Sequence, residues 1–308
     1  MRIGIGIGDI AGRAGDMNEL VAQAQRAEEA GFASVWLANI FGIDALTAAV
    51  VCGRATSRVE VGTGVVPTYP RHPFAMAQQA VTVNAAIGQR LLLGIGLSHQ
   101  VVIEGMLGLS FARSYSHMKE YVGALAPLVR EGKVSFNGEL YRVNAQLRVP
   151  GAAPFPILLA ALAPKMLALA GSVADGTITW MTGAKTLATH IVPSIRAAAE
   201  AAGRPAPRVV AGLPVAVTDD PDEARRVAGK LFRGYGVLPS YRAMLDREGA
   251  AGPGEIAIVG DEAQVGAQLD ALAAAGVTDL MAAPFPVGAS EASLARTFAF
   301  LESRLRAQ

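Results

Sequence analysis

The feature that most constrains this chain is a repeated succession of a short apolar run and a longer amphipathic stretch. The runs are rich in Val, Ile and Leu and end at Gly, Pro or charged residues, as do buried parallel strands joined by helices. The succession occurs eight times, which is the number of strands that closes a parallel barrel. The predicted strands cover residues 3–7, 34–38, 59–65, 91–96, 156–161, 176–180, 209–217 and 277–282.

The stretches between these runs carry helix start and stop signals. Asp16, followed by Glu19, is typical of a capping box, and Gly31 ends the same predicted helix. Pro73 and Pro164 stand where a first helical turn would begin. We therefore predict a (β/α)8 TIM barrel, built as a single domain over residues 1–308.

Two connections are longer than a barrel needs. The one after the fourth strand contains Asn137-Gly138, a strong signal for a tight hairpin. The one after the seventh strand includes residues 234–258, with scattered Gly and Pro. Insertions of this kind cover the mouth of a barrel or mediate assembly.

A doubly wound dinucleotide-binding sheet is the competing fold, because the chain begins Gly4-Ile5-Gly6-Ile7-Gly8. That fold needs its glycines in the turn that opens a helix. Here they lie within a strand, so the barrel is preferred. We interpret them as a narrow strand beside a bound ring.

Composition excludes several classes of protein. The chain is 52% hydrophobic and 17% charged, with a net charge of +1, which argues against disorder and against a nucleic-acid or membrane-surface partner. No apolar run reaches the roughly 18 residues of a spanning helix, and the start lacks the features of a signal peptide. The single cysteine, Cys52, lies in an apolar helix and is predicted to be buried and inert. We expect a cytoplasmic protein.

The active site of a barrel lies at the C-terminal ends of its strands. In this chain those ends are rich in Gly and poor in polar residues. They lack the paired carboxylates of a glycosidase and the ligand cluster of a metal hydrolase, so no metal is predicted. Such a mouth suits a flat, largely apolar cofactor that carries the reactivity itself.

A series of short motifs runs along nearly the whole chain in a fixed order. They are Glu29-Ala30-Gly31-Phe32 before Ser34-Val35-Trp36, Gly62-Thr63-Gly64-Val65 before Arg71-His72-Pro73, Arg90-Leu91 before Gly94-Ile95-Gly96, residues 161–166, and Gly260-Asp261 before Gly276-Val277. In these motifs the chain resembles the luciferase-like monooxygenase superfamily. Within it, the chain resembles reductases and dehydrogenases that use the deazaflavin coenzyme F-420, including methylene-tetrahydromethanopterin reductase.

The resemblance implies where a cofactor would bind. It implies a cis peptide bond between Gly64 and Val65, in a bulge that supports the central ring; the alternative is an ordinary trans bond in a strand. It places the cofactor phosphate at the start of the helix after the fifth strand, whereas a plain strand-to-helix turn is the alternative. The residues predicted for that site are Ala161, Leu162, Ala163, Lys165 and Met166. Asn39 and Gln100 are also predicted to contact the cofactor.

Two departures from the resemblance bear on the reaction. Sugar-phosphate and alcohol dehydrogenases of this kind carry Asp-His after the second strand, and this chain has Asn39-Ile40. They carry a catalytic Glu after the fourth strand, where this chain has Leu97. Because Ile and Leu cannot transfer a proton, a dehydrogenase of that type is disfavoured.

Several other residues are candidates at the mouth. His99 is the candidate catalytic residue, as proton donor or orienting donor, and an equally supported interpretation is a histidine packed in its loop. His72 precedes a helix, which favours a structural role. Asp9, Tyr69, Trp180 and Met181 are predicted to line the substrate pocket, although Trp180 fits a core position equally well and Asp9 a solvated loop.

Together these features predict an F-420-dependent oxidoreductase that reduces an activated C=C or C=N bond of a small molecule. An FMN-dependent monooxygenase and a non-catalytic cofactor-binding barrel are the alternatives. The resemblance also implies a homodimer that packs through the early helices.

Overall fold

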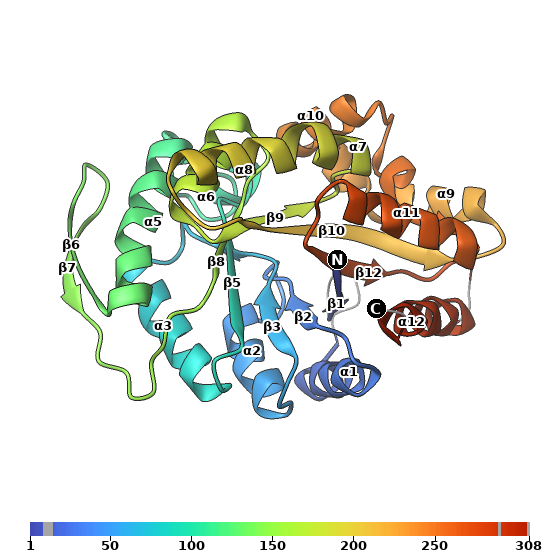
Figure 1. Cartoon of the computed structure of the whole chain (residues 1–308). Coiled ribbons are helices and arrows are strands. Elements are labelled where there is room, and N and C mark those ends of the chain that lie inside the picture. Colours follow the sequence, from blue (N-terminus) through green and yellow to red (C-terminus); the bar gives the residue numbers. More distant parts are fainter. Residues whose placement is uncertain (9–14, 289–290, 307–308) are drawn as a thin grey trace.

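The computed structural model describes residues 1–8, 15–288 and 291–306. Within these residues, eight parallel strands pair in order, and the last pairs with the first, so the sheet closes (Figure 1). The predicted (β/α)8 barrel is confirmed. Its strands are β1 (Arg2–Ile7), β2 (Ser34–Leu37), β3 (Glu60–Thr63), β5 (Leu91–Gly96), β8 (Ile157–Ala160), β9 (Gly176–Trp180), β10 (Arg208–Val217) and β12 (Asp279–Pro284).

Helices surround the barrel in the predicted alternation (Figure 1). They are α1 (Met17–Ala30), α2 (Ala45–Arg54), α3 (Pro73–Ala86), α4 (Gln100–Ile103), α5 (Ser114–Glu131), α6 (Pro164–Val173), α7 (Ala184–Thr186), α8 (Val192–Ala201), α9 (Pro221–Leu231), α10 (Pro239–Glu248), α11 (Glu262–Ala274) and α12 (Glu291–Arg306). None of these helices in the described part of the chain has both the length and the apolar character to span a lipid bilayer.

The predicted helix signals act as expected. The Asp16 carboxylate accepts a hydrogen bond from the Glu19 N–H at the start of α1, and Gly31 ends that helix with a φ of 92°. Pro73 and Pro164 occupy the first turns of α3 and α6. Cys52 is fully buried in α2, so its predicted burial is confirmed, and burial raises the pKa of its thiol to about 11.

An apolar cluster fills the inside of the barrel. It is formed by Trp36, Leu92, Leu158, Ile178, Val210 and Met281. Glycines make room for the indole of Trp36: a Cβ at Gly62 would lie 2.3 Å from its Cε3, and one at Gly4 would lie 2.9 Å from its Nε1. Gly4 therefore accommodates Ser34 and Trp36 of the protein itself, and this packing accounts for a glycine at position 4.

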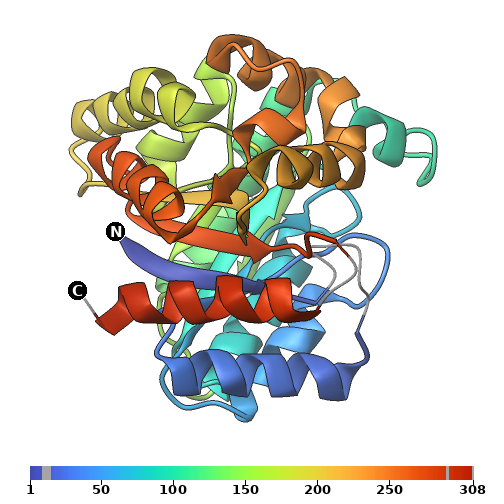
Figure 2. The same cartoon turned by 90° about the vertical axis from the view of Figure 1, so that its right-hand side faces the viewer.

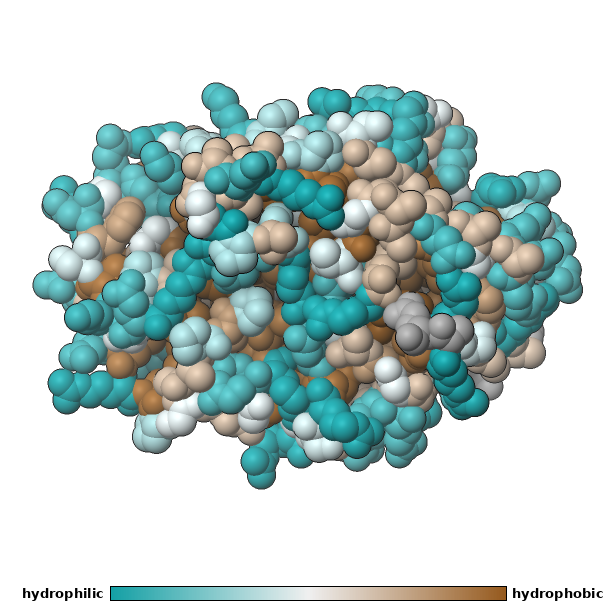
Figure 3. Space-filling view, viewed as in Figure 1, coloured by the Kyte–Doolittle hydropathy of each residue, from teal (hydrophilic) through white to brown (hydrophobic). Residues whose placement is uncertain are grey.

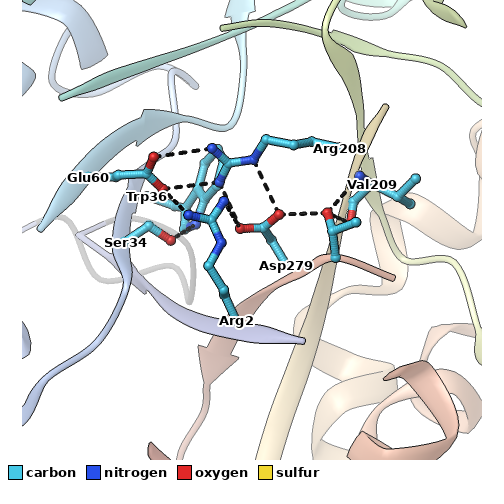
Figure 4. A network of polar contacts seen from close by, with 8 residues as sticks. Arg2, Ser34, Trp36, Glu60, Arg208, Val209 and Asp279 are labelled. Carbon is cyan, nitrogen blue, oxygen red and sulfur yellow. Dashed lines mark hydrogen bonds and ion pairs between the residues drawn. The ribbon is translucent and has the colours of Figure 1, made fainter. Parts of the chain in front are cut away.

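A polar network closes the end of the barrel at which the strands begin (Figure 4). Arg208 lies between Glu60, at 3.1 Å, and Asp279, at 2.7 Å, and Arg2 contacts the same two carboxylates. Asp279 is only 1% exposed. Seen from this side, hydrophilic residues lie across the middle of the surface (Figure 3). This end is thus a charged floor that joins four strands.

The two insertions are where the sequence placed them. The first forms an antiparallel hairpin of β6 (Lys133–Asn137) and β7 (Arg142–Gln146). The Gly138 N–H donates to the Tyr141 carbonyl over 2.8 Å, so the predicted tight hairpin is confirmed, but its turn centres on residues 139 and 140 and not on Asn137-Gly138. The Glu120 carboxylate accepts hydrogen bonds from the N–H groups of residues 139, 140 and 141, which stabilises the turn at that position.

The second insertion contains α10 and three shorter elements, which are η3 (Arg233–Val237), η4 (Pro253–Ile256) and β11 (Ile258–Gly260). β11 extends the sheet beside the end of β10. Elsewhere, the short β4 (Val66–Pro67) pairs with β5 after an interruption in the third strand.

Candidate active site

The strands all end on the face opposite the charged floor. In Figure 2, β1 runs from the N-terminus on the left towards the right, where the teal segment that contains α4 projects. We call this end the mouth; it consists of the residues that follow the eight barrel strands. It is the end at which barrel enzymes carry their active sites.

A bulge interrupts the third strand at the mouth. The Gly64–Val65 peptide bond is cis, as the resemblance implied. The Gly64 N–H donates to the carbonyl of Leu37 over 2.8 Å. The Val65 side chain packs on β5, where a Cβ at Gly96 would lie 2.7 Å from its Cγ2. Val65 is half-buried beside the inner core, so the bulge contributes apolar surface at the bottom of the mouth.

Trp180 ends β9 and lies on the inner core. Its ring makes edge contacts with Phe232, just before the second insertion, and with Tyr235 within it, at centroid distances of 5.7 and 6.0 Å. The insertion therefore covers part of the mouth, which was one of its two predicted roles. The indole Nε1 of Trp180 is buried and has no hydrogen-bond partner among the described residues.

Met181, the next residue, has a φ of 53°. Its side chain is fully buried in the outer core between strands and helices. In this structure it offers no exposed surface that could line a pocket.

The segment after β8 leads into an exposed helix start. Ala161 is buried, Leu162 is half-buried, and Ala163 and Lys165 are exposed. The Ala163 carbonyl accepts from the N–H groups of Met166 and Leu167, at 3.0 and 2.9 Å. The side chain of Met166 is buried. Because Pro164 has no N–H and those of Met166 and Leu167 are engaged, the first turn of α6 presents the backbone N–H and the side chain of Lys165 to solvent.

Asn39 follows β2 and takes part in the start of α2. Its Oδ1 accepts from the N–H of Ala45 over 3.0 Å. Its Nδ2 has no partner in residues 1–8, 15–288 and 291–306. Asn39 is half-buried, and the neighbouring Ile40 is 44% exposed.

After β5, His99 precedes α4 and is half-buried. Its ring lies 5.6 Å from that of Tyr241 in α10. Burial lowers the pKa of His99, which favours the neutral imidazole. Gln100 is exposed and donates its Nε2 to Glu104 over 2.8 Å, so its side chain is already engaged.

A group of side chains around His117 was not predicted. Tyr69 stacks on the His117 ring at 3.8 Å, and Nε2 of His117 lies 2.9 Å from Oγ1 of Thr68. Oγ1 of Thr68 donates to the Gly96 carbonyl, so it accepts from Nε2–H, and Nδ1 of His117 then accepts from the hydroxyl of Tyr141 at 3.2 Å. Burial lowers the pKa of His117 to about 4. This group holds Tyr69, which is half-buried, at the edge of the bulge.

The remaining candidates are settled by their contacts or lie outside the described residues. Nδ1 of His72 accepts from the N–H of Phe74 over 3.2 Å and caps α3, so the structural role is confirmed. Asp9 lies outside the described residues. Across the residues that are described, no three His, Cys, Asp or Glu side chains come together as metal ligands.

Comparison with known proteins gives relatives that include enzymes named for coenzyme F-420, and solved structures that also include monooxygenases. The chain is 35% identical to a protein of Mycobacterium tuberculosis named as a coenzyme F-420-dependent oxidoreductase, over 51% of this chain and 49% of that protein. It is 29% identical to 5,10-methylenetetrahydromethanopterin reductase of Methanolobus tindarius, over 73% and 69%. It is 31% identical to an F-420-dependent glucose-6-phosphate dehydrogenase of Nakamurella multipartita, over 70% and 68%.

The fold agrees with these relatives. The coenzyme F-420-dependent tetrahydromethanopterin reductase of Methanopyrus kandleri superposes with a TM-score of 0.80 at 19% identity, over 98% of this chain and 97% of that one. A family model described as luciferase-like monooxygenase matches residues 3–279. The chain therefore belongs to the luciferase-like monooxygenase family.

Proposed function

We propose that this chain is a coenzyme F-420-dependent oxidoreductase that acts as a reductase. The observation that carries the proposal is the composition of the mouth. An apolar surface around Val65 meets an exposed helix start, and the residues that follow β2 and β5 include Ile40 and Leu97, which cannot transfer a proton. The names of the three relatives support the choice of cofactor.

The residues present fit a flat cofactor with a phosphate group. Val65 and Ala160 offer apolar surface beside the inner core. The buried Nε1 of Trp180 lacks a partner among the described residues, as a donor does when an absent molecule is its acceptor. The start of α6, with Lys165 beside it, suits an anion.

When bound, the deazaflavin would supply the hydride. Asn39 would donate its Nδ2 to the polar edge of the ring, and Val65 would support one face. Lys165 would bind the phosphate with its ammonium group and its backbone N–H. Ile40 and Leu97 hold no exchangeable proton, so the proton that accompanies the hydride would come from solvent or from the N–H of a neutral His99. Reduction of an activated C=C or C=N bond needs orientation above all, which is worth up to about 10 kcal/mol.

Titration of the purified protein with F-420 and with FMN tests the proposal. Trp180 lies at the mouth and Trp36 inside the barrel, so quenching of Trp180 emission should report uptake, and the Trp180→Phe variant identifies that signal. We expect F-420 to bind and to be consumed with an enone acceptor. Preference for FMN would favour a monooxygenase, and uptake of neither would favour a scaffold.

Lys165→Glu should weaken F-420 binding about tenfold, because it removes a charge-assisted contact with the phosphate. Lys133→Glu is the matched control, since Lys133 is an exposed lysine in the distant hairpin. Calorimetric titration measures both variants. Equal affinities of the Lys165→Glu and Lys133→Glu variants for F-420 would show that the phosphate does not bind at the start of α6.

We also propose a homodimer that packs through the face of the early helices α1 and α2. Light scattering on the purified protein measures the mass and decides between one chain and two.

A further inference from the structure

One loop at the mouth, which follows β5, contacts two other parts of the covering structure. Residues 101–109, called here the 101–109 segment, lie between His99 and Phe111. His99 contacts Tyr241 in the insertion after β10, and Phe111 stacks on Tyr69, which follows β4, at 5.4 Å. Tyr241 lies in α10, whose Glu248 accepts hydrogen bonds from Lys185 and Thr186 after β9. The ends of the segment therefore contact two different covering elements, the loop after β4 and helix α10.

The 101–109 segment exposes an unusual number of large apolar side chains. Val101 is 65% exposed, Met106 61%, Leu107 45% and Leu109 39%. Phe41 in the loop after β2 is 67% exposed. Large apolar side chains exposed at this density along one segment mark a candidate binding surface.

The charged side chains on this side of the mouth are already engaged, two as cations in ion pairs and one carboxylate in hydrogen bonds. In the loops after β2, β4 and β5 (residues 38–44, 68–72 and 97–113) the charged residues are Asp44, Arg71, Glu104 and Arg113. Arg71 pairs with Asp44, and Arg113 pairs with Glu139. Glu104 accepts hydrogen bonds from Gln100 and from the N–H of Phe111. No cation is left in these loops for a phosphate or carboxylate of a substrate.

We propose that the substrate is a neutral molecule with an extended apolar part, which lies under the 101–109 segment. A sugar phosphate does not suit this surface, because a buried anion needs an unpaired cation. The inference rests on the proposed function for the reaction, but its substrate class follows from the loop residues alone. A neutral, alkyl-substituted enone has the required chemistry.

A series of 4-alkylcyclohex-2-enones with methyl, butyl and octyl chains tests the proposal, with glucose 6-phosphate as the charged comparator. Binding is measured by calorimetry on the full chain, with and without F-420. Each fully buried methylene strengthens binding about fourfold, so the butyl compound should bind at least tenfold more tightly than the methyl compound. Glucose 6-phosphate should bind weakest.

Met106→Glu should remove most of the increase in affinity from the methyl to the butyl compound, because it places a charge against the alkyl chain. Leu231→Glu is the matched control: Leu231 is 47% exposed at the end of α9, outside these loops, and this variant should retain the gain. Light scattering on both variants reads the oligomeric state.

Equal affinities along the alkyl series, or tighter binding of glucose 6-phosphate, would overturn the proposal. So would a Met106→Glu variant that changes oligomeric state while its alkyl gain persists, since a second copy of the chain would then cover the segment. If F-420 does not bind but the alkyl gain is present, the proposed reaction fails and the substrate class stands. If F-420 binds but the affinity does not rise with the length of the alkyl chain, the proposed substrate class fails and the proposed reaction stands.

Discussion

At the scale of single residues, His117 explains how Tyr69 is held beside the mouth. The neutral imidazole donates to Thr68 and accepts from Tyr141, while its face supports the ring of Tyr69. Protonation would make both ring nitrogens donors, and the contact with the Tyr141 hydroxyl would have to rearrange. The geometry around the bulge therefore depends on an uncharged His117.

This arrangement predicts a loss of stability in mild acid. The pKa of His117 falls to about 4 on folding, below the roughly 6.5 of an unfolded histidine. Above pH 6.5 the shift costs nothing, because both states are neutral. Below it the unfolded chain binds a proton that the folded chain does not, so by pH 4 about 3 kcal/mol of stability is lost.

Urea unfolding at pH 7, 5.5 and 4.5 measures this loss, and His117→Phe should flatten it. The pKa of His99 is lowered in the same direction, so His99→Phe separates its share. A His117→Phe variant with the wild-type pH dependence would show that another group is responsible.

The residues of the site differ in how far sequence could predict them. The bulge at Gly64–Val65 and the helix start at residues 161–166 belong to continuous motifs, so the resemblance located them. His117 has partners 49 and 24 residues away, and no local pattern marks such contacts. Met181 was predicted to line the pocket, but its side chain turns into the core because its φ is 53°. Non-glycine residues rarely adopt this conformation, and nothing in the sequence indicates it.

At the scale of elements, strands and helices follow local periodicity and caps, which is why their order was predictable. The hairpin loop is the exception. Its turn lies at residues 139 and 140, where the carboxylate of Glu120, about 20 residues away, accepts hydrogen bonds from three consecutive N–H groups. Asn137-Gly138 favours a two-residue turn at its own position, and the longer-range anchor favours a turn two residues further on.

The charged floor links elements that are far apart in sequence. Asp279→Asn should lower the free energy of unfolding by roughly 3 kcal/mol, because it leaves the mostly buried Arg208 without full charge compensation. Asp222→Asn is the control: Asp222 forms an exposed pair with Arg225, and such pairs contribute about 0–1 kcal/mol. Denaturant unfolding compares the two variants, and equal losses would mean that the floor is not a stabilising network.

At the scale of the whole molecule, the barrel has chemically opposite ends. Asp279 begins β12 on the charged floor, and Pro284 ends the same strand at the mouth. Five residue steps along a strand span about 16 Å, and the apolar inner core of Trp36 and Met281 separates the two ends. Groups so separated, with no shared partner, are expected to act independently.

Independence can be measured by combining the floor variant with ligand binding. F-420 at a hundred times its Kd should add about 2.7 kcal/mol to the free energy of unfolding. Because Asp279 contacts none of the residues proposed to hold the cofactor, Asp279→Asn should gain the same increment within about 0.5 kcal/mol. Lys165→Glu, with tenfold weaker binding, should gain only about 1.4 kcal/mol at the same concentration. If F-420 instead stabilised Asp279→Asn less than the wild type and stabilised Lys165→Glu as much as the wild type, the charged floor and not the start of α6 would be linked to cofactor binding.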